Sequence, residues 1–248
     1  MEERVKFGIL GKNISYSFSP KYFAEKFEKL GLHNHKYFTF DIPEIEEFPF
    51  LLYHREHEFR GINVTIPYKE SVMRYMDELN DDAKEIGAVN TIKIMDDNTL
   101  VGYNTDYYGF SKSIEPLLKE HHKKALILGT GGASKAIAYA LNKMNISYKF
   151  VSRNVADDAF LYSLLSKEIL EEYTLIVNCS PIGTHPNIEG CPNIPYQFLT
   201  NQHLLYDLIY NPAETKFLRQ GRENGAVTKS GIDMLALQAE KSWEIWNS

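Results

Sequence analysis

Short apolar runs alternate with amphipathic segments in the first part of the chain. Runs of aliphatic and aromatic residues closed by turn residues are typical of strands, and they occupy residues 5–10, 37–41, 61–66, 89–95 and 99–102. Apolar residues at helical spacing predict helices over residues 19–30, 44–53, 69–79 and 81–87. The first helix has a strong start signal in Ser19-Pro20 and a stop signal in Gly31.

The pattern changes after a predicted helix at 106–119. Shorter, buried-looking strands follow at residues 125–128, 148–152, 175–178 and 204–208, with helices at 136–144 and 234–246. His121-His122 and the two lysines after them are interpreted as a solvated connection. Strands that alternate with helices indicate parallel βαβ units. We therefore expect an α/β fold with two α/β domains around a cleft, the C-terminal one a Rossmann-like doubly wound parallel sheet.

No long linker separates the two halves of the chain. We expect two closely spaced crossings between the domains, near residues 104–110 and 231–233. Residues 1–106 and 233–248 then form one domain, and residues 107–232 form the other.

Composition narrows the partners and the compartment. The 248 residues have a net charge of −6, which gives no electrostatic reason to expect nucleic acid or an anionic membrane. No apolar run approaches the roughly 20 residues that cross a bilayer, the acidic start is unlike a signal peptide, and the two cysteines suit a reducing compartment. We expect a cytoplasmic protein, with monomer and homodimer both open. The eight histidines show no ligand spacing, so no metal site is expected.

A glycine-rich turn joins a predicted strand to a predicted helix at Gly129-Thr130-Gly131-Gly132-Ala133-Ser134. In this context Gly129 permits a tight turn, and Gly131 lets the backbone approach a pyrophosphate. The free N–H groups at the helix start, those of Gly132 and Ala133, attract that anion. Because Ser134 stands at the third glycine position of the dinucleotide fingerprint, a plain strand-to-helix turn is the alternative.

The next predicted strand ends in Ser152-Arg153-Asn154. NAD-binding enzymes usually have an acid here that binds the ribose 2′-hydroxyl. This chain has no carboxylate at that point to repel a 2′-phosphate, and Arg153 can pair with one, so NADP is favoured over NAD. The alternative is an exposed, solvated arginine.

Several polar clusters at predicted strand ends occur in the order found in one enzyme family. They are Ser17-Phe18-Ser19-Pro20, Asn63-Val64-Thr65-Ile66-Pro67-Tyr68-Lys69, Gly87-Ala88-Val89-Asn90-Thr91, Gly102-Tyr103-Asn104-Thr105-Asp106-Tyr107-Tyr108-Gly109, Asn178-Cys179-Ser180-Pro181-Ile182-Gly183, Tyr206-Asp207-Leu208-Ile209-Tyr210 and Gly231-Ile232-Asp233-Met234-Leu235-Ala236-Leu237-Gln238-Ala239. Together with the glycine turn they resemble the shikimate dehydrogenase family over essentially the whole chain. The resemblance implies a reversible, NADP-linked reduction of 3-dehydroshikimate to shikimate, with substrate bound by residues 1–106 plus 233–248 and NADP by residues 107–232.

The resemblance also implies the catalytic residues. Lys69 and Asp106 correspond to the family's catalytic pair. A ketone reduced by hydride leaves an alkoxide that must gain a proton, so the reaction needs an acid–base group. Lys69 is preferred as the proton carrier, but the division of labour with Asp106 stays open. Without the flanking motif, a surface ion pair would be the simpler interpretation.

Substrate-binding and further cofactor-binding residues follow from the same resemblance. The side chains that resemble the family's substrate ligands are Ser17, Ser19, Thr65, Asn90, Tyr210 and Gln238. The two serines would hold the substrate carboxylate, and the amides suit ring hydroxyls because they offer donor and acceptor together. Ser19 as a helix N-cap and Tyr210 as a packing residue are the alternatives. Gly231 and Met234 are expected beside the nicotinamide.

Departures from the family pattern leave other functions open. The loop after Arg153 lacks a second basic residue and contains Asp157 and Asp158, so NAD stays a weaker alternative to NADP. The stretch 154–172 is short, which predicts a trimmed cofactor domain. A quinate/shikimate dehydrogenase of broader substrate use and a non-catalytic nucleotide-sensing relative are the alternative functions.

Overall fold

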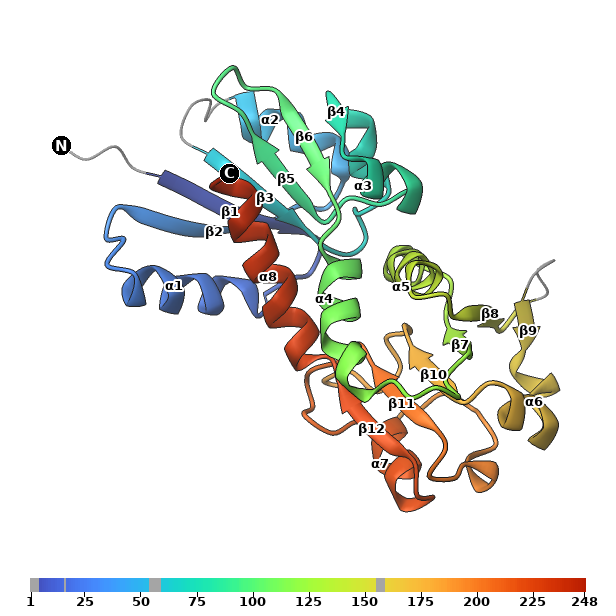
Figure 1. Cartoon of the computed structure of the whole chain (residues 1–248). Coiled ribbons are helices and arrows are strands. Elements are labelled where there is room, and N and C mark those ends of the chain that lie inside the picture. Colours follow the sequence, from blue (N-terminus) through green and yellow to red (C-terminus); the bar gives the residue numbers. More distant parts are fainter. Residues whose placement is uncertain (1–4, 16, 54–58, 155–158) are drawn as a thin grey trace. The chain divides into compact units, whose positions relative to one another are not determined.

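The computed structural model describes residues 5–15, 17–53, 59–154 and 159–248 (Figure 1). The chain forms two compact units, one of Met1–Thr105 with Ala239–Ser248 and one of Asp106–Gln238. The second division falls inside the last helix, α8 (Ile232–Trp246), and so comes later than the expected 231–233. Among the helices of the described ranges, none is both long and apolar enough to cross a membrane.

A six-stranded mixed sheet is the centre of the first unit. Its strands are β1 (Val5–Gly11), β2 (His35–Asp41), β3 (Phe59–Val64), β4 (Glu78–Leu79), β5 (Thr91–Ile94) and β6 (Leu100–Tyr103). The helices and 3-10 turns of this unit are α1 (Ser19–Lys29), η1 (Ile45–Glu47), α2 (Phe48–Tyr53), η2 (Ser71–Tyr75), α3 (Asp81–Ile86) and the second part of α8. The strand order is β2-β1-β3-β5-β6-β4, in which β1 pairs in parallel with β2 and β3, while β5 pairs antiparallel with β3 and β6.

Apolar side chains on the two faces of this sheet form separate clusters. On one face, the Trp246 ring of α8 stacks on Phe7 of β1 with 4.8 Å between centroids. Gly61 of β3 admits that ring, because a Cβ at this position would lie 2.1 Å from the indole Nε1. On the other face, Leu10 and Ile62 belong to a second buried cluster. The alternation of side chains along each strand thus gives the sheet a core on both sides.

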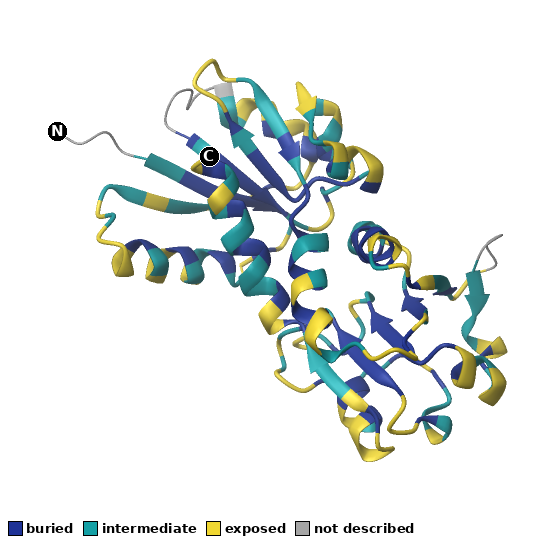
Figure 2. Ribbon diagram, in the orientation of Figure 1, coloured by how far each residue is buried: buried dark blue, intermediate teal, exposed yellow. Residues whose placement is uncertain are grey.

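The second unit is built on a six-stranded parallel sheet. Its strands are β7 (Lys124–Leu128), β8 (Ser147–Ser152), β9 (Ala159–Leu161), β10 (Leu175–Asn178), β11 (Leu204–Asp207) and β12 (Val227–Ser230). The helices and 3-10 turns are α4 (Asp106–Ile114), η3 (Glu115–Leu117), α5 (Gly132–Lys143), η4 (Tyr162–Leu164), α6 (Lys167–Glu172), η5 (Tyr196–Phe198), α7 (Lys216–Glu223) and the first part of α8. The order β12-β11-β10-β7-β8-β9, with every neighbouring pair parallel, is that of a doubly wound Rossmann-like sheet. The predicted α/β fold class is confirmed, and Figure 2 shows the central strands of this sheet largely buried.

Three segments differ from the expectation. The helix predicted over 69–79 is the 3-10 turn η2 followed by strand β4, because the N–H groups of Asp77 and Asn80 donate to carbonyls along β6. Strands β9 and β12, at the two edges of the second sheet, were not predicted. In the connection before β7, His121 and Lys123 are exposed as expected, but His122 is only 5% exposed and its Nδ1 accepts a hydrogen bond from the Lys119 N–H.

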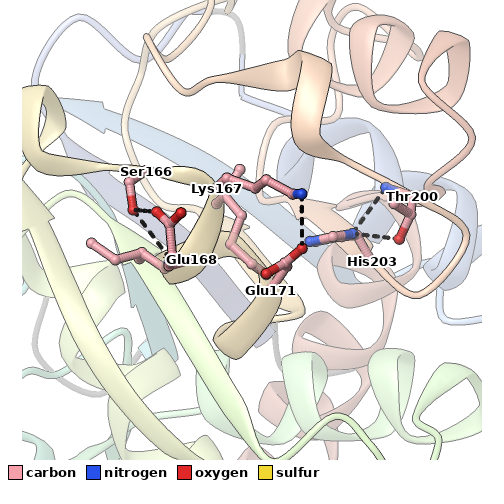
Figure 3. Close-up of polar contacts among 8 residues, drawn as sticks. Ser166, Lys167, Glu168, Glu171, Thr200 and His203 are labelled. Atoms are coloured by element: carbon pink, nitrogen blue, oxygen red, sulfur yellow. Dashed lines mark hydrogen bonds and ion pairs between the residues drawn. The ribbon is translucent and has the colours of Figure 1, made fainter.

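The short stretch between β8 and β10 ends in the helix α6. Ser166 caps this helix by accepting from the Ile169 N–H at 3.4 Å, and Lys167 pairs with Glu171 one turn later (Figure 3). His203 connects α6 to the loop before β11: its Nδ1 accepts from the Thr200 N–H at 3.0 Å, and its Nε2 lies 2.9 Å from a carbonyl oxygen of α6. Hydrogen bonds with Ser166 at its first turn and with His203 near its end therefore hold this short helix in place.

Candidate active site

Three predicted site residues of the first unit meet at the carboxyl end of β3. Thr65 follows this strand directly, and the preceding Val64 N–H donates to the Asn90 carbonyl at 2.8 Å. The Val89 N–H, one residue before Asn90, donates to the Lys69 carbonyl at 2.7 Å. These backbone bonds bring Thr65, Lys69 and Asn90 together, with Asn90 buried and Lys69 half-buried.

The Asn90 side chain is held in one orientation. Its Oδ1 accepts from the Thr105 N–H at 2.7 Å, and its Nδ2 donates to Thr105 Oγ1 at 3.0 Å. Thr105 is the residue before Asp106 in the chain. The amide of Asn90 therefore fixes the backbone that leads into the predicted catalytic aspartate.

Ser19 is the first residue of α1, but its hydroxyl does not cap that helix. The N-cap position belongs to Phe18 and has no side-chain cap bond, so the N-cap interpretation of Ser19 is wrong. The Ser19 side chain is instead buried close to the Tyr37 hydroxyl, whose pKa burial raises well above its usual value. Ser17, half-buried, donates its N–H to the Ile14 carbonyl at 2.9 Å.

The remaining predicted substrate-side residues belong to the second unit. Asp106 is the first residue of α4 and is 6% exposed. Gln238 on α8 is buried and donates from Nε2 to the Leu235 carbonyl at 3.1 Å. Tyr210 follows β11 and is half-buried. Helices α4 and α8, which carry Asp106 and Gln238, cross closely, because a Cβ at Gly109 would lie 2.5 Å from the Met234 carbonyl oxygen.

The glycine turn after β7 has the geometry of an anion site. Gly129 has φ +113°, a conformation that favours glycine, and a Cβ there would touch the backbone of Cys179 at 3.4 Å. Gly131 is the N-cap of α5 and has no side-chain cap bond. A Cβ on Gly131 would meet nothing within 4 Å, so packing among the described residues does not require glycine here. Open space at Gly131, directly before the N–H groups of Gly132 and Ala133 at the start of α5, fits the pyrophosphate of a dinucleotide.

Ser152 and Arg153 stand at the carboxyl end of β8. Ser152 Oγ accepts from the Asn154 N–H at 3.1 Å, which shapes the turn. Arg153 is exposed, and no ion pair joins it to another described residue. The arrangement fits a charged hydrogen bond to a 2′-phosphate. The acidic pair Asp157 and Asp158 lies outside the described residues.

Gly231 and Met234 have structural explanations of their own. A Cβ at Gly231 would lie 2.4 Å from the Leu208 carbonyl oxygen, so packing alone accounts for the glycine. Met234 is 7% exposed and belongs to the apolar cluster that contains Phe110 and Tyr206. Contact of either residue with a nicotinamide stays a prediction.

Asp207 is a buried group to which sequence reasoning assigned no role, although it lies in the quoted Tyr206–Tyr210 motif. Its side chain is 0% exposed and accepts from Asn178 Nδ2 at 3.0 Å, the Ile209 N–H at 3.1 Å and Thr215 Oγ1 at 2.6 Å. Burial raises the Asp207 pKa to about 6, while the three hydrogen bonds lower it. This carboxyl ties the segments after β10 and β11 together.

Metal ligands do not gather in the part of the chain that the structure describes: no group of three or more His, Cys, Asp or Glu side chains could hold an ion there. Cys179 and Cys191 are free thiols. The predicted site residues offer hydroxyl, amide, ammonium and carboxylate groups.

Several known proteins with a similar sequence or fold are shikimate dehydrogenases. The family model of the shikimate dehydrogenase substrate binding domain matches residues 9–92. A shikimate dehydrogenase (NADP(+)) of Carboxydothermus hydrogenoformans is 40% identical over 256 residues, and one of Methanococcus maripaludis strain S2 is 36% identical over 257 residues; each match covers 96% of this chain and 90% of the relative. The solved structure of shikimate 5-dehydrogenase from Thermus thermophilus in complex with NADP(H) and shikimate matches with a TM-score of 0.82 and 29% identity, over 98% of this chain and 93% of that one. On the sequence identity along nearly its whole length, the chain belongs to the shikimate dehydrogenase family.

Proposed function

We propose that this protein is an NADP-dependent shikimate dehydrogenase, which reduces 3-dehydroshikimate reversibly to shikimate. The observation that carries the proposal is the match over 96% of the chain to enzymes of that name. The polar residues at the strand ends of both units are the ones that this chemistry needs. Residues 1–106 and 233–248 bind the substrate, and residues 107–232 bind NADP.

The reaction requires a hydride and a proton. NADPH, when bound, supplies the hydride. Lys69 Nζ gives a proton to the alkoxide oxygen of the reduced substrate and takes it back when shikimate is oxidised. Asp106 orients the ammonium group. The Asn90–Thr105 hydrogen bonds support this assignment, because they fix the backbone next to Asp106.

Substrate recognition relies on hydroxyl and amide groups. Ser17 and Ser19 hold the carboxylate, and four side chains bind the ring oxygens, namely Thr65, Asn90, Tyr210 and Gln238. The meeting of Thr65, Lys69 and Asn90 at the end of β3 supports this role.

The cofactor is assigned to the turn after β7 and the end of β8. The residues are Gly129, Gly131, Gly132, Ala133, Ser152, Arg153, Gly231 and Met234. Open space beside Gly131 suits the pyrophosphate, and the exposed Arg153 suits the 2′-phosphate of NADP.

The protein works in the cytoplasm as a monomer or homodimer. Both cysteines are free, in keeping with a reducing compartment. Size-exclusion chromatography with light scattering measures the number of subunits, and a larger assembly would contradict the proposal.

A single titration series tests the activity. Purified protein is mixed with shikimate or quinate and with NADP⁺ or NAD⁺, and the nicotinamide absorbance is followed. We expect the highest kcat/KM with shikimate and NADP⁺, since selectivity is expressed in that ratio. Comparable values with quinate would identify a quinate/shikimate dehydrogenase. Nucleotide binding without turnover of either substrate would refute the proposal and favour a sensing role.

A further inference from the structure

A buried hydroxyl on the C-terminal helix joins polar residues from several elements of the first unit. Ser242 lies on α8, one turn after Gln238, and is 0% exposed. Its Oγ accepts from Asn63 Nδ2 at 3.0 Å. The same oxygen lies 2.8 Å from Thr91 Oγ1 and 3.2 Å from Thr105 Oγ1. Ser242 is therefore a junction of three buried polar side chains.

Chemistry fixes the donor and the acceptor in two hydrogen bonds of this junction. The amide nitrogen of Asn63 only donates, so Ser242 Oγ accepts from it. Thr91 Oγ1 donates to Asn90 Oδ1 at 3.1 Å and lies 2.8 Å from Ser242 Oγ, a contact in which either hydroxyl can be the donor. Asn90 Oδ1 also accepts from the Thr105 N–H. The series from Asn63 through Ser242 and Thr91 therefore ends on the amide oxygen of Asn90 and supports the acceptor role that the Thr105 N–H gives this oxygen.

The other end of the series leads to Tyr37. Asn63 Oδ1 accepts from the Tyr37 hydroxyl at 2.7 Å. One hydrogen-bonded chain thus runs from Tyr37 through Asn63 and Ser242 to Thr91, where it meets Asn90. It joins β2, β3, α8 and β5.

We propose that Ser242 is a positioning residue for substrate binding, which helps to hold Asn90 in the orientation that recognition of the substrate requires. The inference rests on the proposed function, in which the Asn90 side chain binds a ring oxygen. Without the Ser242 hydroxyl, Asn63 Nδ2 keeps only its longer contacts of 3.2 and 3.3 Å, and Thr91 loses a hydrogen-bond partner. Asn63, and through Thr91 the Asn90 amide, then lose a constraint, while the apolar packing around α8 keeps its shape.

The test compares Ser242→Ala with Ser113→Ala. Ser113 is a matched control, since it is 6% exposed and its hydroxyl lies 2.6 Å from the Tyr206 hydroxyl, but it belongs to no proposed site. We expect both variants to lose thermal stability. Ser242→Ala should also raise KM for shikimate about 10-fold, the effect of one lost buried hydrogen bond, with kcat and KM for NADP⁺ changed less than about twofold. Ser113→Ala should keep all three kinetic constants within about twofold of wild type.

Thr91→Val keeps the shape of the threonine and removes only the hydroxyl that links Ser242 to Asn90. The same rise in KM for shikimate is expected, which keeps the proposal testable where Ser242→Ala fails to fold. Folded variants with wild-type KM would overturn the role of Ser242 alone. Two variants that both fail to fold would show that the hydroxyl chain serves folding, and would overturn it too. A wild-type protein that does not turn over shikimate would overturn the proposed function along with this inference.

Discussion

Asp207 allows the balance between burial and hydrogen bonding to be measured. Its carboxyl is 0% exposed at the end of β11, and burial raises its pKa from 3.8 to about 6 despite three hydrogen-bond donors. Because the pKa is higher in the folded state, that state binds the proton more tightly than the unfolded chain does. The stabilisation from this group is fully present below about pH 4 and is lost as the pH rises through about 6.

The size of the effect follows from the two pKa values. The difference between 3.8 and about 6 corresponds to roughly 3 kcal/mol, at about 1.4 kcal/mol per unit. Asp207→Asn should lack this dependence, since an amide oxygen keeps the bonds from Asn178 and Ile209, while an amide N–H donates to Thr215 Oγ1. The free energy of unfolding of the wild type, relative to that of the variant, should therefore fall by roughly 2.5 kcal/mol between about pH 4 and pH 7.5.

Urea denaturation at a series of pH values measures this difference. Both tryptophans, Trp243 and Trp246, lie in the other unit, so far-UV circular dichroism is a better probe than tryptophan fluorescence. Asp96→Asn is the control, because the Asp96 side chain is 88% exposed and should leave the pH profile of the wild type unchanged. Parallel curves for the wild type and Asp207→Asn would show that the hydrogen bonds cancel the effect of burial, and a difference of opposite sign would show that they outweigh it.

Four further substitutions test the remaining assignments. Lys69→Ala should lower kcat by roughly 100-fold or more, the usual effect of losing an acid–base group; near-normal steady-state turnover would mean that Lys69 does not carry the proton. Arg153→Ala should raise KM for NADPH and leave KM for NADH almost unchanged, and equal losses with both cofactors would contradict the 2′-phosphate contact. Gly231→Ala should lower the free energy of unfolding by about 1–3 kcal/mol, as measured in urea, because its Cβ would lie 2.4 Å from the Leu208 carbonyl oxygen. Gly131→Ala should fold normally and weaken NADPH binding in a fluorescence titration, and wild-type affinity would mean that the turn does not approach the cofactor.

Hydrophobic patterning predicted the central strands of the second sheet and missed its edges. β7 and β10 each have a parallel neighbour on both sides, and their apolar runs are almost entirely buried. β9 and β12 have one neighbouring strand each, so their residues can be exposed or half-buried. The sequence of β12, for example, is Val-Thr-Lys-Ser. An edge strand of this kind has no apolar signature. The helix predicted before β4 failed for a related reason, since hydrogen bonds to β6 override a weak helical pattern.

Linear motifs were sufficient to nominate the candidate site, because its residues lie beside strand ends and glycine turns. The residues that orient them carry no such signal. Asn63 and Ser242 are 179 positions apart, and Thr91 and Ser242 are 151 apart, so only the folded chain brings them into contact. The spacing of one helical turn between Gln238 and Ser242 was the available clue. At Ser19 the opposite happened: a good N-cap pattern was present in the sequence, but the Ser19 hydroxyl does not cap the helix.

Energetics favours an orienting role for the buried hydroxyl chain over a stabilising one. A hydrogen bond between buried neutral groups contributes only about 1 kcal/mol net, and replacing both partners by apolar groups of the same shape is often nearly neutral. Alanine at Ser242 and valine at Thr91 would fill much the same space, so packing alone gives no reason for hydroxyls at two positions that are 0% exposed. Apolar side chains cannot influence whether the oxygen or the nitrogen of the Asn90 amide faces a substrate. The Thr105 N–H makes Asn90 Oδ1 the acceptor, and the Thr91 hydroxyl beside Ser242 strengthens that orientation, so removal of the hydroxyl chain should change KM more than it changes the fold.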